Sequence, residues 1–331
     1  MPKTYDVRPV NSSNHDTLVQ LIRTTNYAPA RMMQRYAGRN AIEEHLIKKY
    51  ENSTIYGVFE SDKLIATTIL SPLQWDSEIY NQKMGSLEHT IYHGHVADKT
   101  TLVDALTTLV KHVELLARKQ SYDFLLCKTF TDDIQLIHAL QRSEFYLVDT
   151  LLDYVYHNQY RPLDEINEPS SHLPIVIRDA NQADRSDLVQ LAEITFESHF
   201  GRYHSDNRTD KELATSVYVE WIKSSLDGYG DRILVADLDG EIVGYTVWRH
   251  PLNETNILGR IGQYSIAGIH PDSSGANLFR VLTYAGMQAL APLTDFIVGP
   301  THINNYPVQR GYESLGWRIH DARHAFHKWL D

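Results

Sequence analysis

The sequence has a single cysteine among its 331 residues, so no disulfide can form within the chain. That residue, Cys127, lies in the apolar stretch FLLCKTF, where we expect a buried thiol. No apolar run approaches the roughly 20 residues that a membrane-spanning helix needs. The opening residues, MPKTYDVRPV, lack the apolar core of a signal peptide. These absences favour a cytoplasmic protein that does not enter a membrane.

Positive charge is also scarce. There are 31 lysines and arginines against 42 acidic residues, a net charge of −11. This balance argues against general binding to nucleic acid or to an anionic membrane. An anionic cofactor remains compatible with it where helix N-termini and backbone amides supply local donors. The sequence contains no Cys-x-x-Cys, His-Glu-x-x-His or Gly-x-Ser-x-Gly motif, so we expect no metal ion and no serine nucleophile.

An internal repeat organises what is present. DFLL begins at Asp123 and DFIV at Asp295, and each is followed 22 residues later by an aromatic residue, Phe145 or Trp317. The order of the expected helices and strands also matches between the two halves. The sequence therefore predicts two copies of one α/β unit.

A polar segment with three prolines, RPLDEINEPSSHLP at 161–174, is typical of a linker. We therefore predict an N-terminal domain at 1–160 and a C-terminal domain at 175–331.

The stretch IAGIHPDSSGANLFRVL (266–282) predicts a strand, a polar loop containing Gly275, and an amphipathic helix. Free amides at such a helix start can bind a phosphate or a pyrophosphate. Many helices begin in the same way and bind nothing, so this pattern alone leaves both interpretations open.

The stretch NNYPVQRGYESLGW (304–317) predicts a short helix between Asn305 and Tyr312, followed by a turn into the last strand. The tyrosine is either a core residue beside a glycine C-cap or a proton donor at the mouth of a sheet.

The order strand, loop, helix, strand, helix with Asn and Tyr, strand resembles the GNAT superfamily of acyl-CoA-dependent N-acyltransferases. The resemblance implies an α/β fold of two tandem GNAT-like domains, each a mixed, mostly antiparallel sheet flanked by helices. It also implies coenzyme A as the acyl-carrying co-substrate. Its pantetheine arm would lie between two diverging strands, here Gly262–Ile269 and Asp295–His302.

The resemblance assigns roles to particular residues. Tyr312 would protonate the departing thiolate, and a backbone amide near Gly268 or Ile269 would hold the oxyanion. The remaining cofactor contacts would be Ser274, Gly275, Ala276, Asn277 and Asn305. Asn277 and Phe279 depart from the small residues that are usual in this loop.

The repeat supplies an internal comparison. Tyr312 follows Asp295 by 17 residues, and the same step from Asp123 leads to Leu140. No glycine lies between Val96 and Asp123 to form a phosphate loop. We expect the first half to be catalytically silent and the second half to carry the chemistry.

Two further stretches, at 196–226 and 73–88, resemble segments of bacterial N-acyltransferases of the TDP-fucosamine acetyltransferase type, which modify nucleotide-linked amino sugars. The implied acceptor is the amine of a dTDP-linked 3-amino or 4-amino dideoxyhexose used for surface polysaccharide. The implied acyl group is acetyl or a short hydroxyacyl such as 3-hydroxybutanoyl.

The acceptor candidates follow from the chemistry of their side chains. The guanidinium of Arg202 can grip a phosphate with its forked donors, and Tyr203 or Tyr218 can stack on a base or a sugar. Asp206 would either orient the amine or cap a helix beginning near Thr209. Three more candidates are Trp75 for the acceptor and, as bases that titrate near neutral pH, His204 and His302.

Two other functions remain open. The chain is compatible with a tandem GNAT enzyme that acylates a different small amine or uses aminoacyl-tRNA. It is also compatible with a non-enzymatic regulator that binds coenzyme A or a nucleotide sugar. A homodimer remains one option for its assembly.

Overall fold

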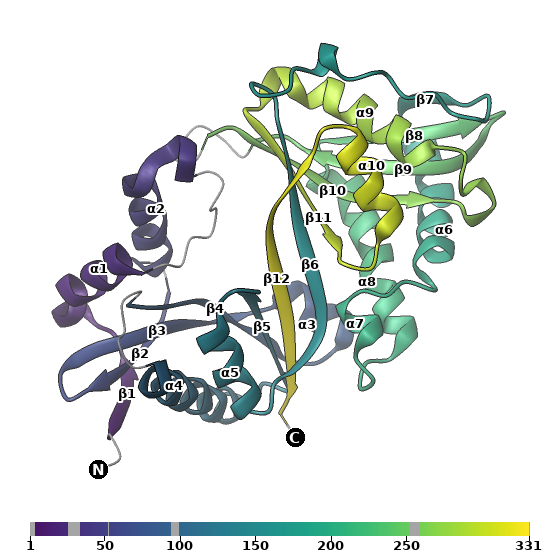
Figure 1. Ribbon diagram of the computed structural model, residues 1–331. Helices are drawn as coiled ribbons and strands as arrows, with labels where there is room; N and C mark the ends of the chain where they lie inside the picture. The colour runs from purple at the N-terminus through teal and green to yellow at the C-terminus, as the bar shows by residue number, and fades with distance from the viewer. Residues whose placement is uncertain (1–3, 26–33, 52, 94–98, 252–258, 331) are drawn as a thin grey trace. The chain divides into compact units, whose positions relative to one another are not determined.

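The computed structural model describes residues 4–25, 34–51, 53–93, 99–251 and 259–330 (Figure 1). The chain divides into two compact units. The first unit comprises Met1–Thr150 and Arg323–Asp331, and the second unit comprises Leu151–Ala322. Within the described ranges, no helix has both the length and the apolar character that crossing a lipid bilayer requires.

The first unit is built on one mixed sheet. Its elements are β1 (Tyr5–Pro9), α1 (His15–Thr24), α2 (Gln34–Glu51), β2 (Ile55–Glu60), β3 (Lys63–Pro72), α3 (Gln74–Tyr80), β4 (Met84–Tyr92), α4 (Lys99–Lys119), β5 (Phe124–Phe130) and α5 (Ile134–Arg142). The strands lie in the order β1, β2, β3, β4, β5 and then β12 (Arg318–Trp329). Strands β4 and β5 are parallel, and the other neighbours in this order are antiparallel.

The second unit repeats this plan. Its elements are β6 (Tyr146–His157), β7 (Val176–Asp179), α6 (Arg185–Phe196), α7 (Arg202–Ser205), α8 (Lys211–Ser224), β8 (Arg232–Leu238), β9 (Glu241–Arg249), β10 (Ile261–Ile269), α9 (Leu278–Leu290), β11 (Phe296–His302) and α10 (Tyr306–Ser314). The strands lie in the order β6, β11, β10, β9, β8, β7, and β10 and β11 form its parallel pair. Single helical turns occur at Ser12–Asn14, Leu163–Glu165, Gln182–Asp184, Ser225–Tyr229, Pro271–Ser273 and Ala291–Leu293.

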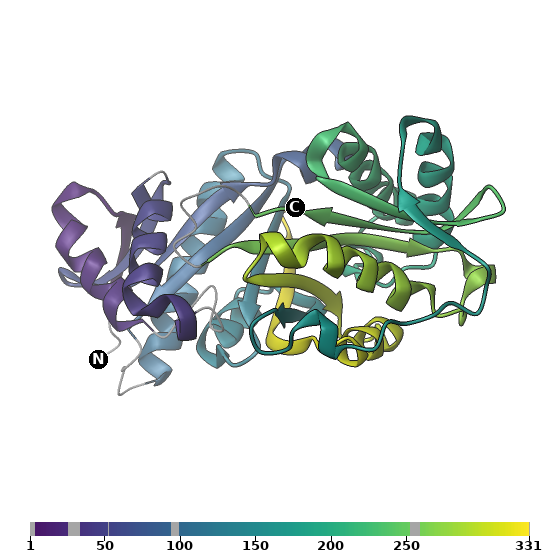
Figure 2. The ribbon, with the colours of Figure 1, turned by 90° about the horizontal axis from the view of Figure 1, so that it is seen from above.

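Helices cover both faces of the second sheet (Figures 1 and 2). Helices α9 and α10 pack on one face in a core that includes Tyr264, Leu282, Tyr312 and Trp317. Helices α6 and α8 pack on the opposite face, in a core that includes Leu188, Leu191, Ile222 and Tyr245. In α9 the buried Leu278, Leu282 and Leu290 recur at multiples of four, which gives the helix its apolar side. The arrangement confirms the expected mixed, mostly antiparallel sheets flanked by helices.

The two repeats exchange their last strands. Residues 151–157 of β6 pair with β11 in the second unit, and β12 from Arg323 onward pairs with β5 in the first unit. The predicted domains, 1–160 and 175–331, follow the repeat in the sequence, whereas the compact units follow strand pairing. The expected linker, 161–174, lies within the second unit.

The repeat extends to the geometry of the helix ends. The amide of Phe145 donates to the carbonyl of Leu140 at 3.0 Å, and the amide of Trp317 donates to that of Tyr312 at 3.0 Å. The residue before the aromatic has a positive φ in both halves, 62° in the first and 85° in the second. Both helices therefore end in the same left-handed cap, and Leu140 occupies the position of Tyr312.

Candidate active site

Strands β10 and β11 diverge in the middle of the second sheet. They pair only over three residues each, Ile261–Gln263 with Phe296–Val298. Beyond this point β10 stays paired with β9 to Ile269, and β11 stays paired with β6 to His302. The facing edges of the two strands therefore leave backbone groups that no strand satisfies, which is the arrangement that a pantetheine arm needs.

Tyr312 points at this divergence from α10. A Cβ on Gly299, the first residue of β11 past the paired region, would lie 2.7 Å from the Tyr312 hydroxyl. The phenol ring stacks on Trp317 with centroids 4.6 Å apart, and it also contacts Tyr154 and Tyr264. The aromatic cluster holds the hydroxyl in place against β11.

The Tyr312 hydroxyl is fully enclosed. The side chain is 0% exposed, and its hydroxyl interacts with that of Tyr264 but has no partner in good hydrogen-bond geometry among the described residues. Burial raises the pKa of the phenol well above its ordinary value, and the neighbouring Tyr264 and Tyr154 act in the same direction. The phenol therefore carries its proton at neutral pH, and a ligand atom reaches it only when neighbouring side chains move. A buried hydroxyl without a good hydrogen bond lowers the free energy of unfolding by about 1–3 kcal/mol. A tyrosine that keeps such a hydroxyl is therefore a candidate for a functional role.

The loop before α9 carries open amides. Gly275 has φ +84° and Asn277 has φ +66°, so both adopt the left-handed conformation that glycine and asparagine tolerate best. The departure at Asn277 thus preserves the backbone shape of the loop. The amides of Leu278, Phe279 and Arg280 start α9 and have no intrahelical acceptor. These donors fit a pyrophosphate.

A segment of the expected linker lies across this loop. The Asn277 side-chain amide donates to the Ser170 carbonyl at 2.7 Å, and the His172 amide donates to the Ala276 carbonyl at 3.1 Å. The Ser171 hydroxyl donates to the same Ala276 carbonyl at 3.3 Å. Two of these bonds use the Ala276 carbonyl and the third uses the Asn277 side chain, so the open backbone amides of Leu278, Phe279 and Arg280 remain available.

Arg280 places a positive charge beside this loop, where it could bind an anionic group. Its Nη1 donates to Asn277 Oδ1 at 3.4 Å, and its buried Nε has no partner within the described ranges. Phe279, the other departure, packs against α10, where a Cβ on Gly311 would lie 2.5 Å from its ring. Glycine at 311 accommodates the larger side chain. Asn305 begins α10 half-buried, and its side chain makes no capping bond.

The end of β10 was expected to supply the oxyanion amide. Gly268 is buried, and a Cβ there would lie 2.6 Å from the ring of Tyr245, whose own hydroxyl is buried without a partner in the described part of the chain. The register of β10 with β9 shifts between Tyr264 and Ile266, which is a β-bulge. The bulged Ser265 accepts a hydrogen bond at 3.0 Å from the indole of Trp221 on α8.

A histidine pair lies where β11 ends. His199, which follows α6, has its Nε2 3.2 Å from Nε2 of His302. Its ring stacks on Phe200 at 5.0 Å and meets Tyr218 edge-on at 4.8 Å. Burial lowers the pKa of His199 to about 3, and His302 and His204 act in the same direction. His199 is therefore neutral at physiological pH.

The other acceptor candidates lie on or beside α7. Arg202 is half-buried and lies over the ring of Tyr203, 4.4 Å from its centroid, while Tyr203 itself is only 3% exposed. His204 is half-buried, and burial lowers its pKa. Its Nε2 lies 3.3 Å from the Thr215 hydroxyl.

Asp206 is buried and accepts a bond from the Arg208 amide at 2.9 Å. It does not cap the following helix, because α8 begins at Lys211 and Asp210 accepts from the amides of its first turn. The expectation of a cap by Asp206 was wrong. Trp75 is 37% exposed on α3 and belongs to the first unit, so its part in acceptor binding stays a prediction.

In the first unit, a hydrogen bond between side chains spans the equivalent gap between two diverging strands. Strands β4 and β5 also stop pairing early, at Leu87 and Cys127. There the hydroxyl of Tyr92, at the end of β4, donates to the carboxyl of Asp133, and Thr129 donates to the same carboxyl at 3.3 Å. This side-chain bridge closes the divergence and places an acid at the position of Asn305.

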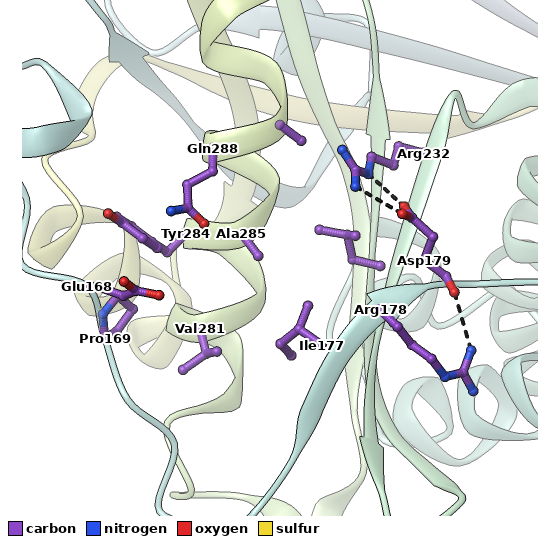
Figure 3. A pocket seen from close by; sticks show the side chains of 12 residues that line it. Glu168, Pro169, Ile177, Arg178, Asp179, Arg232, Val281, Tyr284, Ala285 and Gln288 are labelled. Carbon is purple, nitrogen blue, oxygen red and sulfur yellow. Dashed lines mark hydrogen bonds and ion pairs between the residues drawn. The ribbon is translucent and has the colours of Figure 1, made fainter.

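A separate pocket of 490 Å³ lies between α9 and the strands β7 and β8, of which β7 is the edge strand (Figure 3). Its guanidinium groups are already paired. Arg232 binds Asp179 at 2.7 Å, and Arg178 binds Asp184 at 2.7 Å. None of the residues predicted for the active site lines this pocket.

Sequence reasoning missed several of these residues. His199 lies inside the 196–226 stretch but was not singled out there, and its contact with His302 appears only in the structure. The glycines at 299 and 311 are a signal that could have been used, because a glycine inside a strand or a helix often marks a place where another side chain comes close to the backbone. Here those side chains are Tyr312 and Phe279. In the described ranges no cluster of three or more His, Cys, Asp or Glu residues could hold a metal ion.

The chain was compared with protein families, with curated proteins and with solved structures. No family model matches the chain. The chain is 20% identical over 279 residues to the spore coat polysaccharide biosynthesis protein SpsD of Bacillus subtilis (strain 168), covering 82% of this chain and 87% of SpsD.

Two solved structures match over nearly the whole length. One is a GCN5-related N-acetyltransferase from Sphaerobacter thermophilus, with a TM-score of 0.60 and 12% identity, covering 100% of this chain and 97% of that one. The other is a tandem GNAT protein from the clavulanic acid biosynthesis pathway, with a TM-score of 0.56 and 12% identity, covering 99% of both chains. The chain therefore has the tandem GNAT fold, as its motifs predicted.

Proposed function

We propose that the protein transfers an acyl group from coenzyme A to the amine of a nucleotide-linked amino sugar. The acceptor would be a dTDP-linked 3-amino or 4-amino dideoxyhexose, the acyl group acetyl or a short hydroxyacyl such as 3-hydroxybutanoyl, and the reaction cytoplasmic. One observation carries the proposal. The diverging strands β10 and β11 lie between an amide-rich loop beside α9 and a histidine and aromatic cluster beside α6 and α8. The similarity to SpsD, named for polysaccharide biosynthesis, supports the sugar class.

The residues divide between the two substrates. The open amides of Leu278, Phe279 and Arg280, with the Arg280 side chain and Asn305, would hold the phosphates of acyl-CoA, while the Ala276 amide already donates to the Ser273 carbonyl. Its thioester would lie past the paired part of β10 and β11, with its carbonyl oxygen on an amide near Gly268 or Ile269. On the other face, Arg202 would hold a phosphate of the acceptor, and Tyr218 would contact its base or sugar.

The chemistry is a direct attack. The amine nitrogen forms a bond to the thioester carbonyl, the carbon–sulfur bond breaks, and the Tyr312 phenol gives its proton to the departing thiolate. The nitrogen loses one proton as it becomes an amide, and that proton restores the phenol. In its enclosed state this phenol is a weaker acid than a thiol, whose ordinary pKa is about 8.5. Entry of the thioester must therefore move the aromatic side chains around Tyr312 before the proton is transferred.

We place one active site in each chain. The second unit has the open loop and the phenol, whereas the first unit has Leu140 and the Tyr92–Asp133 bridge at the equivalent positions. A buried acid at Asp133 would also repel the phosphates of coenzyme A.

The enclosure of Tyr312 favours one competing function, a regulator that binds coenzyme A or a nucleotide sugar without turnover. A thermal-shift screen with acyl-CoAs and with dTDP-linked and UDP-linked amino sugars separates the two, because each ligand stabilises a protein that binds it. Enzyme function predicts stabilisation by both ligand classes, and an acylated sugar in the mass spectrum of a mixed acyl-CoA reaction. Binding without product would support the regulator instead.

Calorimetry gives the stoichiometry of the donor. We expect one coenzyme A per chain, and two equal sites would contradict the assignment of the first unit as silent.

A further inference from the structure

We infer that His199 and His302 form a one-proton base for the acceptor ammonium, with His302 as the catalytic residue and His199 as the residue that positions it. The inference rests on the proposed amine acylation and adds the group that activates the amine. Its geometric basis is the 3.2 Å separation of the two Nε2 atoms and the edge-on packing of the rings, 4.9 Å apart.

The contact requires one hydrogen between two nitrogens. Two imidazoles that meet through Nε2 make a hydrogen bond only if one of them is protonated there and the other is not. A second added proton would place a positive charge on each ring at this distance, which is strongly unfavourable in a partly buried site. The pair therefore takes up one proton and holds it as a unit.

The surroundings decide which ring carries that charge. His199 is packed among Phe196, Phe200 and Tyr218, and burial holds its pKa at about 3. The titratable groups that face it are His302 at the end of β11, His204 on α7 and Tyr218 on α8. Lys211 acts on His204 and lowers its pKa further. None of these neighbours favours a charge on His199, so the added proton resides on His302.

The place of His302 suits this role. It is the last residue of β11, the strand whose edge is exposed by the divergence from β10. The pair also adjoins Tyr218 and Phe196, on the face where α6 and α8 pack, opposite the loop assigned to coenzyme A. An acceptor that enters on this face meets the imidazoles before it meets the thioester.

The step balances without a further reactant. A nitrogen–hydrogen bond of the acceptor ammonium breaks, a nitrogen–hydrogen bond forms on His302, and the freed lone pair attacks the thioester. Neutral His199 accepts a hydrogen bond from Nε2 of the resulting His302 imidazolium. That bond stabilises the charged form of the pair.

The test compares pH profiles of kcat for the wild type, His302→Gln, His199→Phe and His199→Gln. His302→Gln should lower kcat about 10²–10⁴-fold, the range for loss of a general base. His199→Phe should shift the acidic limb to lower pH and lower kcat about 10-fold, because His302 loses its acceptor. His199→Gln, whose amide oxygen can accept the bond, should recover most of both losses.

His157→Gln is the matched control, because His157 is another partly buried histidine of the second unit that lies against Phe296. It should leave the pH profile unchanged. The coenzyme A Kd of every variant, measured by calorimetry, shows whether each remains folded, since that site lies on the other face. An acidic limb that does not move in His199→Phe, or a wild-type kcat in His302→Gln, would overturn the inference.

Nitrogen NMR of the imidazoles tests the pair without any acceptor. As the pH is lowered, the pair should take up one proton while His199 stays neutral. Independent titration of both rings would contradict the inference whatever the substrate is. If the wild type acylates no amino sugar but shows the coupled titration, the proposed function fails and the proton-sharing pair stands.

Discussion

The Tyr312 hydroxyl points at Gly299, so that a Cβ at this glycine would come within 2.7 Å of the oxygen. The phenol and the backbone of β11 are therefore in direct contact where β11 leaves β10.

Removal of the phenol oxygen should separate catalysis from stability. In Tyr312→Phe we expect kcat to fall about 10²–10⁴-fold with little change in either KM, because proton transfer belongs to the transition state. The free energy of unfolding should change little, because the hydroxyl makes no well-formed hydrogen bond and interacts only with the Tyr264 hydroxyl. Steady-state kinetics and thermal unfolding measure the two effects.

Tyr156→Phe is the control for that variant. Tyr156 is also fully buried, but its hydroxyl donates to the Arg161 carbonyl at 2.6 Å. It should lose about 0.5–1.5 kcal/mol of stability and keep its kcat. If Tyr312→Phe keeps kcat within about threefold of wild type, a barrier change of about 0.65 kcal/mol, Tyr312 is not the acid.

Gly299→Ala should create a clash with the Tyr312 oxygen. We expect a loss of about 1–3 kcal/mol, typical of overpacking a buried site. In a Tyr312→Phe background the oxygen is absent, so the same substitution should cost less. Urea unfolding of the four variants in this double-mutant cycle measures the coupling. Equal losses in both backgrounds would mean that the contact is not the source of the strain.

The first unit should stay silent even when it is given a phenol. Leu140→Tyr in a Tyr312→Phe background should not restore turnover, because the Tyr92–Asp133 bridge still closes the divergence of β4 and β5. Residual kcat is the measurement. Recovery above the Tyr312→Phe level would show that the two units are functionally equivalent.

Two arginines should separate the substrates. Arg202→Ala should raise the acceptor KM and spare the donor, whereas Arg280→Ala should raise the donor KM and spare the acceptor. Each charge-assisted bond is worth about 1.5–3 kcal/mol, which corresponds to roughly 10–150-fold in KM. Each variant serves as the control for the other, and a reversed pattern would exchange the two binding sites.

His199 should make stability depend on pH. The unfolded imidazole takes up a proton near pH 6.5, whereas the folded one does so only near 3. Between these values the unfolded chain binds more protons, so the free energy of unfolding falls as the pH is lowered from about 6.5 toward 3 and is constant above that range. His199→Asn should remove up to about 1.4 kcal/mol per pH unit of this slope, as measured by urea unfolding. An unchanged slope would show that His199 is not held neutral by the fold.

Local spacing predicted much of this protein. The 22-residue step from DFLL to Phe145 and from DFIV to Trp317 indicated the repeat, and the structure ends both helices in the same cap. The helix with Asn305 and Tyr312 and the loop around Gly275 were found because helix periods, turns and caps depend on residues a few positions apart. The order of these elements along the chain resembles that of the GNAT superfamily, and this resemblance predicted the tandem GNAT fold.

The site required contacts that no local pattern encodes. His199 and His302 are 103 residues apart, and the bond between Asn277 and Ser170 spans 107. The enclosure of Tyr312 depends on rings from β6, β10 and α9 and on Trp317, the residue before β12. The bridge in the first unit is a bond between Tyr92 and Asp133, 41 residues apart. The sequence by itself determined the elements and their order, because these arise from neighbouring residues. Only the tertiary structure decided which side chains meet and which lose water, because packing sets the distances and burial sets the pKa values.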